Sequence, residues 1–277
     1  MNSQSLPWLS FLPLLPILQF LILMPQLPRG SSYPDYSDEI YYQSCGNLFK
    51  CGDISDVGYP FHSSNNGPEH CGYPGFELSC NGENTTIDIM NQTYRVSEIN
   101  QASKTMKIVR EDIMEGNCPQ EFVNITLDNS LFEYTTTYIN LTFLYGCHGG
   151  INNIPGIATI PCGDSNDAYV LPAGAGVSVN CNTSVIVPVP VVVGAGYGGS
   201  VDSTLLMKTL KEGQEIRWKM DSKACDDCSK SKGRCGFSIF TNQTTCYCPS
   251  PPYISDTCSV SIPAASPASP GHVGIVR

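Results

Sequence analysis

Apolar and polar residues follow a pattern that predicts β-strands through much of the chain. Residues 85–89 and 93–99 are rich in β-branched and aromatic side chains, and residues 104–109 have the same character. Along residues 123–127 and 139–145 apolar and polar side chains alternate, which turns one face of a strand toward a core. The chain is therefore predicted to be mainly β.

Two segments in the second half of the chain depart from this pattern. Residues 185–193 are all Val, Ile or Pro, and proline cannot donate a ladder hydrogen bond, so we expect an edge strand or an extended connection. One short helix is predicted near 204–212, because Ser203 stands at the N-cap position and Gly213 can end the helix.

Two further segments are interpreted from their composition. Residues 147–181 are rich in Gly, Pro and Asn, which predicts loops held by cysteines. Lys104, Lys107 and Arg110 form a small basic group, for which a solvated strand edge is favoured over a ligand site.

Cysteine content indicates what holds such a chain together. The chain has 277 residues, only 14% of them charged, and it contains 14 cysteines. Cytosolic thiols are kept reduced, so this density indicates an oxidising compartment and up to seven disulfides. The predicted fold is mainly β and disulfide-rich, with two small Cys-rich β modules. The cysteines are Cys45, Cys51, Cys71, Cys80, Cys118, Cys147, Cys162, Cys181, Cys225, Cys228, Cys235, Cys246, Cys248 and Cys258.

Four cysteines near the C-terminus allow a second interpretation. Cys225-x-x-Cys228 and Cys246-x-Cys248 have spacings that suit tetrahedral zinc, whose usual ligands include paired thiolates. The same residues can form disulfides, and export favours oxidation. We therefore expect disulfides here, with neither a metal nor a cofactor.

Both ends of the chain are predicted to lie outside the folded part. Residues 6–27 are apolar and uncharged, which is typical of an export signal, so a signal peptide is predicted at 1–32. An uncleaved membrane anchor is the alternative, although 4 prolines interrupt the stretch. Residues 261–277 are rich in Ser, Ala and Pro, which predicts a disordered tail.

Six Asn-x-Ser/Thr sequons agree with export. One sequon carries little weight, but several in a Cys-rich exported chain predict occupied sites. Asn124 and Asn140 lie on the polar side of alternating segments, where a glycan leaves the core undisturbed. The predicted N-glycosylation sites are Asn84, Asn91, Asn124, Asn140, Asn182 and Asn242.

No catalytic pattern stands out. Residues 194–201 match G-x-G-x-x-G-x-V, a glycine loop of nucleotide sites, but prolines break the preceding strand and no kinase motif follows. A flexible loop is the favoured interpretation. The chain has 4 histidines, none in an H-E-x-x-H pattern, and it has no G-x-S-x-G elbow. We expect no enzymatic activity.

The first four cysteines stand in a motif that resembles a known family. A Cys is followed by Cys-Gly, then Tyr-Pro-Phe, then Cys-Gly-x-Pro-x-Phe-x-Leu-x-Cys. This order resembles the galacturonan-binding extracellular domain of plant wall-associated receptor kinases, and it implies such a domain at 41–110. The matching residues are Cys45, Cys51, Gly52, Tyr59, Pro60, Phe61, Cys71, Gly72, Pro74, Phe76, Leu78 and Cys80.

The following part resembles the wall-associated kinase C-terminal domain, as it is paired with the first in leaf-rust-resistance-type receptor-like kinases. This resemblance implies a second domain at 118–260. Gln214 departs from it, because the family tends to carry Phe there. The matching residues are Leu141, Phe143, Tyr145, Cys147, Gly213, Ile216, Trp218, Cys225, Cys228, Gly233, Cys235, Gly236, Cys246 and Cys248.

The resemblance implies an extracellular location at the cell wall and binding of pectic polysaccharide. Family members are single-pass plasma-membrane receptors with a cytoplasmic kinase, and neither a membrane helix nor a kinase motif follows here. A secreted ectodomain-only relative and a truncated gene model both stay open. Related receptor-like kinases are further candidate partners, and nucleic acid is not.

Charge complicates the implied ligand. Residues 33–100 contain ten acidic and two basic residues, a balance that repels a polyanion. Binding there would need aromatic stacking or a bridging Ca²⁺ held by carboxylates. Core packing is the favoured alternative for each ring. The candidate rings are Tyr59, Phe61, Tyr73 and Phe76.

Basic residues concentrate in the second module instead, which makes it the better candidate for docking a polyanion by charge. The candidates are Lys208, Lys211, Arg217 and Lys219. Three function classes stay open. The favoured one is an extracellular pectin-binding module of a receptor-like protein. The second is a decoy or co-receptor ectodomain that binds no carbohydrate, and the third, an extracellular enzyme, is disfavoured.

Overall fold

The structure, a computed structural model, describes residues 36–65, 67–116, 118, 122–149, 151–162, 166–175, 179–193, 200–220 and 223–259. The architecture below belongs to the compact unit that begins at Ser37. The predicted signal peptide, residues 194–199 of the glycine loop and the C-terminal tail fall outside the described residues, and the predictions for them stay predictions.

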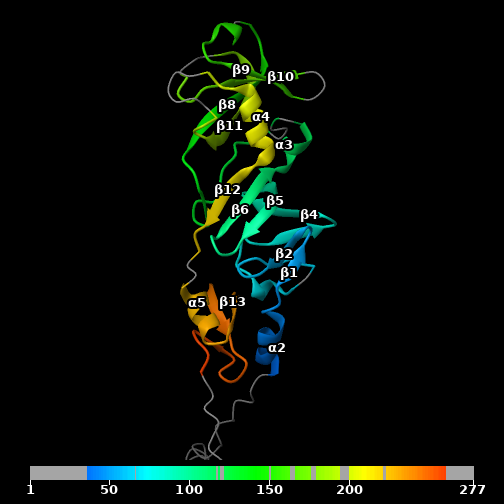
Figure 1. Cartoon of the computed structure of the whole chain (residues 1–277), viewed down its shortest axis with the longest axis vertical. Coiled ribbons are helices and arrows are strands. Elements are labelled where there is room, and N and C mark those ends of the chain that lie inside the picture. Colours follow the sequence, from blue (N-terminus) through cyan, green and yellow to red (C-terminus); the bar gives the residue numbers. More distant parts are fainter. Residues whose placement is uncertain are drawn as a thin grey trace, which may run out of the picture. The chain divides into compact units, whose positions relative to one another are not determined.

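The largest sheet has six strands in the order β3-β4-β5-β6-β12-β7 (Figure 1). The predicted strands at 85–89, 93–99 and 104–109 are confirmed as β4, β5 and β6. A two-stranded ribbon, β1 with β2, precedes this sheet. The bounds are β1 (Phe49–Cys51), β2 (Ile54–Val57), β3 (Leu78–Asn81), β4 (Asn84–Ile89), β5 (Gln92–Asn100), β6 (Thr105–Arg110), β7 (Phe132–Tyr134) and β12 (Gln214–Trp218).

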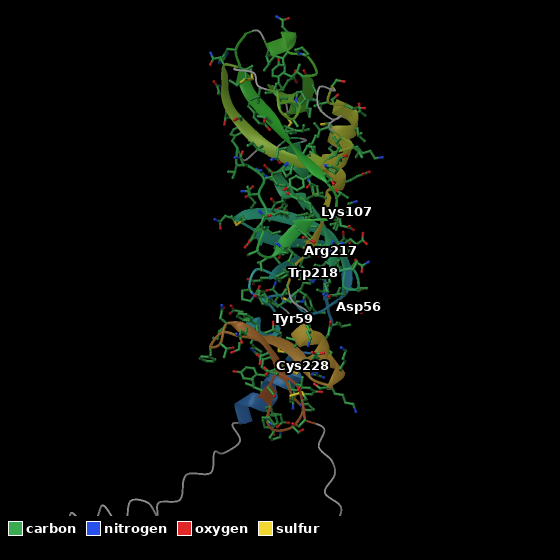
Figure 2. All side chains as sticks on the ribbon, turned by 90° about the vertical axis from the view of Figure 1, so that its left-hand side faces the viewer. Asp56, Tyr59, Lys107, Arg217, Trp218 and Cys228 are labelled. Carbon is green, nitrogen blue, oxygen red and sulfur yellow. A yellow bond between two sulfur atoms is a disulfide. The ribbon has the colours of Figure 1, made fainter. Side chains whose placement is uncertain are left out.

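Strand β12 brings a distant part of the chain into the core of this sheet. It pairs antiparallel with β6, opposing Gln214 to Ile108. Along β12, Ile216 and Trp218 are buried and Arg217 between them is exposed (Figure 2). The Trp218 ring meets the Phe61 ring edge-on at 5.1 Å. Residues from the second predicted module therefore complete the core of the first.

The second sheet has four antiparallel strands in the order β11-β8-β10-β9. The predicted strand at 139–145 is confirmed as part of β8, and residues 185–190 lie in β11, which is an edge strand as expected. Its edge position accommodates prolines, because one side of the backbone has no strand to bond. The bounds are β8 (Tyr138–Cys147), β9 (Ala158–Cys162), β10 (Asn166–Leu171) and β11 (Cys181–Pro190).

The predicted helix is confirmed as α4 (Ser203–Glu212), which buries Leu206 and Leu210 in the core of the four-stranded sheet. Its N-cap is Asp202 rather than Ser203, because the Asp202 carboxylate accepts from the backbone N–H groups of Thr204 and Leu205. Gly213 ends the helix with φ of 83°.

Three expectations about less regular segments were wrong. Residues 123–127 form no strand: Val123 is exposed, and the backbone bond from this segment to β11 runs from the Ile125 N–H to the Ile186 oxygen. Residues 147–181 are not all loop, because they contain the β9–β10 hairpin. The basic group does not lie on a sheet edge, since β6 is an inner strand. Arg110 is buried at 3% exposure and pairs with Asp112 at 2.7 Å.

The C-terminal module consists of a short helix against a small sheet of order β13-β14-β15. Helices α2 (Tyr36–Ser44) and α3 (Glu111–Gly116) and the turns η2 (Glu69–Cys71) and η3 (Ile151–Asn153) complete the described elements. The module's bounds are α5 (Lys223–Lys230), β13 (Arg234–Ser238), β14 (Gln243–Tyr247) and β15 (Ile254–Ser255).

All fourteen cysteines form disulfides, as the sequence predicts. The zinc alternative at the C-terminal module is thereby excluded, because a disulfide sulfur has no thiolate to offer a metal. None of the described helices is long and apolar enough to cross a membrane. The pairs are Cys45–Cys71, Cys51–Cys80, Cys118–Cys162, Cys147–Cys181, Cys225–Cys235, Cys228–Cys246 and Cys248–Cys258.

Candidate functional site

A cleft of about 800 Å³ lies between the first cysteine-rich segment and the C-terminal module. One wall comes from residues 44–50 and 58–63, and the other from α5 and the start of β13. Disulfides fix both walls: Cys45–Cys71 on one side and Cys225–Cys235 on the other. We call this cavity the cleft.

The lining of the cleft is basic, unlike the chain around it. The chain has a net charge of −10, yet no described residue that lines the cleft is Asp or Glu. Lys50 and Arg234 supply positive charge from opposite walls. Asn47 and Gln101 add amide groups that can donate or accept hydrogen bonds. Such a lining suits an anionic ligand with hydroxyl groups.

Arg234 also holds the cleft's two walls together. Its Nη1 donates to the backbone oxygens of Tyr42 at 2.6 Å and Gln43 at 3.2 Å. Both carbonyls lie in the last turn of α2, where no intrahelical donor is available. The guanidinium also lies 4.3 Å from the centroid of the Tyr42 ring. These contacts of Arg234 hold helix α2 against β13. Gly46 leaves room for the Arg234 side chain, because a Cβ at position 46 would collide with it.

The four predicted rings have different positions. Tyr59 and Phe61 line the cleft, whereas Tyr73 and Phe76 are not among its described lining residues. Phe61 and Phe76 are exposed by only 2% and 0%, so their ring faces pack in the core. Tyr73 is half-buried and packs its ring against Phe237 of β13 at 5.0 Å.

The hydroxyl group of Tyr59 connects the first cysteine-rich segment to the C-terminal module. Its Oη lies 3.0 Å from Oγ1 of Thr244 in β14. Burial raises the pKa of the Tyr59 phenol to about 12, so the hydroxyl stays protonated at physiological pH. The ring therefore offers an apolar face with a neutral hydroxyl, which is the kind of surface that sugar rings contact.

His62 forms part of the cleft wall as a neutral group. It is 7% exposed, and burial lowers the pKa of its imidazole, with Glu77 and Glu69 opposing the shift. Gly72 permits this packing, because a Cβ there would collide with the imidazole ring. The glycine of the Cys71-Gly72 pair in the sequence motif is therefore required sterically, because a larger residue would displace His62.

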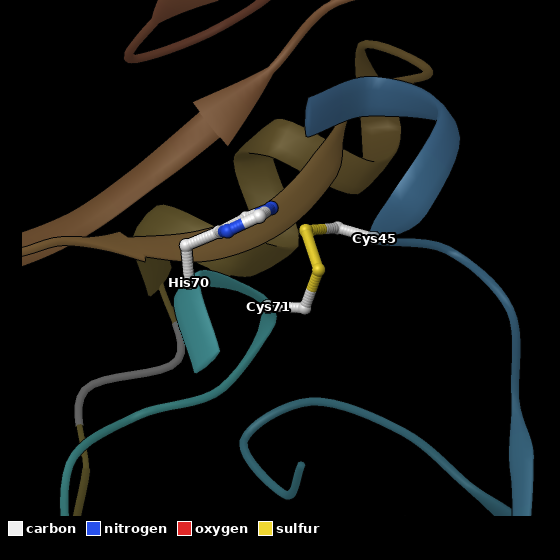
Figure 3. Close-up of side chains that lie close together, drawn as sticks. All are labelled: Cys45, His70 and Cys71. Atoms are coloured by element: carbon white, nitrogen blue, oxygen red, sulfur yellow. A yellow bond between two sulfur atoms is a disulfide. The ribbon is translucent and has the colours of Figure 1, made fainter. Parts of the chain in front are cut away.

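His70 lies beside the Cys45–Cys71 disulfide (Figure 3). Its Nε2 lies 3.1 Å from Oγ of Ser44, and its ring meets the Tyr41 ring edge-on at 4.5 Å. The two cysteines and the histidine are close enough to resemble a metal site. Because both sulfurs are joined in the disulfide, the group fits a structural contact rather than a metal.

The four basic candidates of the second module lie away from the cleft, and three of them have local partners. Lys208 pairs with Glu212 at 3.8 Å, and Arg217 pairs with Glu133 at 3.4 Å. The Nζ of Lys219 donates to the Asn129 backbone oxygen at 2.6 Å. Lys208 and Lys211 lie on α4, whereas Arg217 is on β12. None of the four is among the described residues that line the cleft.

The residues that sequence reasoning missed are Lys50 and Arg234. Each adjoins a cysteine of a recognised motif, Cys51 or Cys235. That adjacency was the available signal, because neighbouring disulfides fix where such a side chain can reach. The sequence could not show that Arg234, 192 residues away, contacts Tyr42.

Two protein families match separate parts of the chain. Residues 45–110 match the family described as wall-associated receptor kinase galacturonan-binding. Residues 164–251 match the family described as wall-associated receptor kinase C-terminal. The cleft therefore lies between segments that the two families cover separately. No solved structure matches the chain.

Several receptor-like kinases of Arabidopsis thaliana are similar to the chain. Leaf rust 10 disease-resistance locus receptor-like protein kinase-like 2.4 is 30% identical over 70% of this chain and 30% of its own length. The 2.8 protein of this series is 32% identical over 75% of this chain and 22% of its own length. The chain thus spans less than a third of either relative. With both extracellular domain families matched in order, the chain belongs to the family of wall-associated receptor kinase ectodomains.

Proposed function

We propose that the chain is the extracellular polysaccharide-binding module of a cell-wall-associated receptor-like protein, and that the cleft binds pectic galacturonan. The single observation that carries this proposal is the charge of the cleft: Lys50 and Arg234 line it, and no described lining residue is acidic. A galacturonan carries one carboxylate on each sugar, so a basic cleft within an acidic protein favours it over neutral polymers.

Each part of the cleft has a role in this proposal. Lys50 faces ligand carboxylates as a point charge, and Arg234 adds positive potential from the opposite wall while clasping α2. Tyr59 offers its ring to the apolar face of a sugar, and Asn47 and Gln101 bond to hydroxyl groups. Because the described lining holds no carboxylate, it offers a bridging Ca²⁺ no carboxylate ligand, and binding in the cleft is proposed to be independent of Ca²⁺.

The decisive measurement is calorimetric titration of the secreted glycoprotein with an unesterified oligogalacturonide. We expect binding that weakens as salt concentration rises, that survives chelation of Ca²⁺, and that is lost with the fully methyl-esterified oligomer. Reversing one charge by Lys50→Glu should weaken binding by about tenfold or more. Lys208→Glu, on the exposed face of α4, is the matched control and should bind like the unmodified protein.

Two outcomes would contradict polysaccharide binding in the cleft. Equal binding by Lys50→Glu together with a loss in Lys208→Glu would place the polyanion on the second module. No binding of any oligomer, combined with pairing to the ectodomain of a related receptor-like kinase, would favour the decoy or co-receptor alternative.

A further inference from the structure

The exposed aromatic side chains have an unexpected distribution along the chain. Among the described residues, only three Phe, Tyr or Trp side chains are exposed: Phe122 at 56%, Tyr138 at 46% and Phe240 at 93%. Each stands two residues before the asparagine of a sequon that ends in threonine. Single apolar residues on a surface are ordinary. Ordinary exposure does not explain why all three rings share one position relative to a sequon.

On β8 the strand geometry brings ring and asparagine together. Tyr138 and Asn140 are two residues apart, so their side chains leave the same face of the strand, about 7 Å from one another. Both are exposed. The Tyr138 ring rests against the Tyr134 ring at a centroid distance of 4.4 Å, which anchors it on one side.

The other two pairs lie outside strands. Phe240 and Asn242 are in the turn between β13 and β14, where Asn242 is exposed and has φ of 54°. Phe122 rests against the Tyr145 ring at a centroid distance of 4.9 Å. Near it, Oδ1 of Asn124 accepts from the Ile186 N–H at 2.8 Å. A sugar is attached through Nδ2, so this bond can orient the amide for its glycan.

We propose that Asn124, Asn140 and Asn242 carry N-linked glycans whose inner N-acetylglucosamine packs on the ring two residues earlier. In the transfer the asparagine Nδ2 bonds to C1 of that sugar and gives up a proton. The bond between C1 and the lipid-linked pyrophosphate donor breaks at the same time. The C–H groups on one face of the sugar then lie over the negative face of the ring. Each ring is thereby covered by the protein's own modification.

The other three sequons provide a contrast within the same chain. Asn84, Asn91 and Asn182 are preceded two residues earlier by Gly82, Ile89 and Asn180, none of which offers a ring. Ile89 is moreover buried at 2% exposure. Glycans at these positions would have no aromatic platform, so they serve as matched controls.

The hairpin at Phe240 gives the sharpest test. The secreted protein is produced with oligomannose glycans, and one portion is trimmed by an endoglycosidase that leaves a single sugar. A second portion is freed of all sugar by a peptide amidase. Exchange of the backbone amides of Ser238 and Gln243, the register pair beside the turn, is then followed by mass spectrometry. Intact glycopeptides report whether Asn242 is occupied.

We expect Phe240→Ser to speed this exchange roughly two- to tenfold in the full-glycan and single-sugar forms, and not in the sugar-free form. Asn242→Asp should exchange like the sugar-free protein, because the amidase leaves an aspartate at this position. This variant is preferred to Thr244→Ala, because Thr244 also contacts Tyr59. Asn91→Gln, which removes a glycan without a ring, should leave the hairpin unchanged.

Two results would overturn the proposal. The first is an unmodified Asn242 in the secreted protein. The second is a Phe240→Ser effect of equal size in all three forms, because the ring would then act without the sugar. Parallel measurements with Tyr138→Ser and Phe122→Ser extend the same comparison to Asn140 and Asn124.

Discussion

The contacts of Arg234 with α2 allow the stability of α2 docking to be predicted quantitatively, because this one side chain joins α2 to β13. Arg234→Met keeps most of the side chain's length and removes the guanidinium. The substitution removes two charge-assisted hydrogen bonds to the carbonyls of Tyr42 and Gln43, and a cation–π contact with the Tyr42 ring. Hydrogen bonds to charged groups contribute about 1.5–3 kcal/mol. An exposed cation–π contact adds about 0.5–1 kcal/mol.

These terms are not additive, and the arginine is only half-buried, so we expect a loss of about 2 kcal/mol in the docking of α2. That corresponds to roughly a thirtyfold rise in the population of undocked α2. The helix stays tethered at Cys45 by its disulfide, so global unfolding should change less than local opening. Hydrogen exchange of α2 measures this opening directly.

Two further variants make the result decisive. Gly46→Ala changes no charge, but its Cβ would meet the Arg234 side chain, so it should release α2 in the same way. Arg217→Met removes an exposed ion pair with Glu133 and should leave α2 unchanged, because such pairs contribute little. Unchanged exchange of α2 in both Arg234→Met and Gly46→Ala would refute the reasoning.

Two other predictions concern acid and disulfide packing. Burial lowers the pKa of both His62 and His70, so the unfolded chain binds protons more readily, and stability should fall as pH decreases below about 6.5. Thermal unfolding at a series of pH values should show this slope, and His62→Gln should flatten it. Gly233→Ala should disturb the C-terminal module, because its Cβ would meet the sulfurs of Cys246, Cys228 and Cys258. Disulfide mapping of the secreted variant checks this, with Gly67→Ala, which meets nothing, as control.

Local structure was predictable where short-range chemistry decides it. The helix at 204–212 was predicted from a capping residue at its start and a glycine at its end, and that glycine, Gly213, adopts φ of 83°, which few other residues tolerate. Its N-cap was misassigned by one residue, since Asp202 and Ser203 are both capping residues and only the carboxylate's actual bonds distinguish them. Residues 123–127 alternate like a strand, yet the segment bonds to β11 at too few positions to form a ladder.

Long-range structure could not be predicted from the same patterns. Ile216 and Trp218 were recognised as motif residues, but nothing in the pattern showed that β12 would pair with β6. The bond between Arg234 and the Tyr42 carbonyl joins residues 192 positions apart. Such contacts depend on where whole elements pack, which neither periodicity nor local spacing encodes. Of the four candidate rings, Tyr59 and Phe61 line the cleft and Tyr73 and Phe76 do not, and the sequence patterns singled out neither Lys50 nor Arg234 as a site residue.

The charge of a segment and the charge of a site are different quantities. Residues 33–100 are strongly acidic, which argued against a polyanion near the first cysteines. Salt screens exposed charges beyond about 8 Å at physiological ionic strength, so acids farther than that from the cleft contribute little to the potential within it. Inside, Lys50 and Arg234 come from the two family segments. Neither module alone has this charge pattern, which is why it arises only where β13 meets α2.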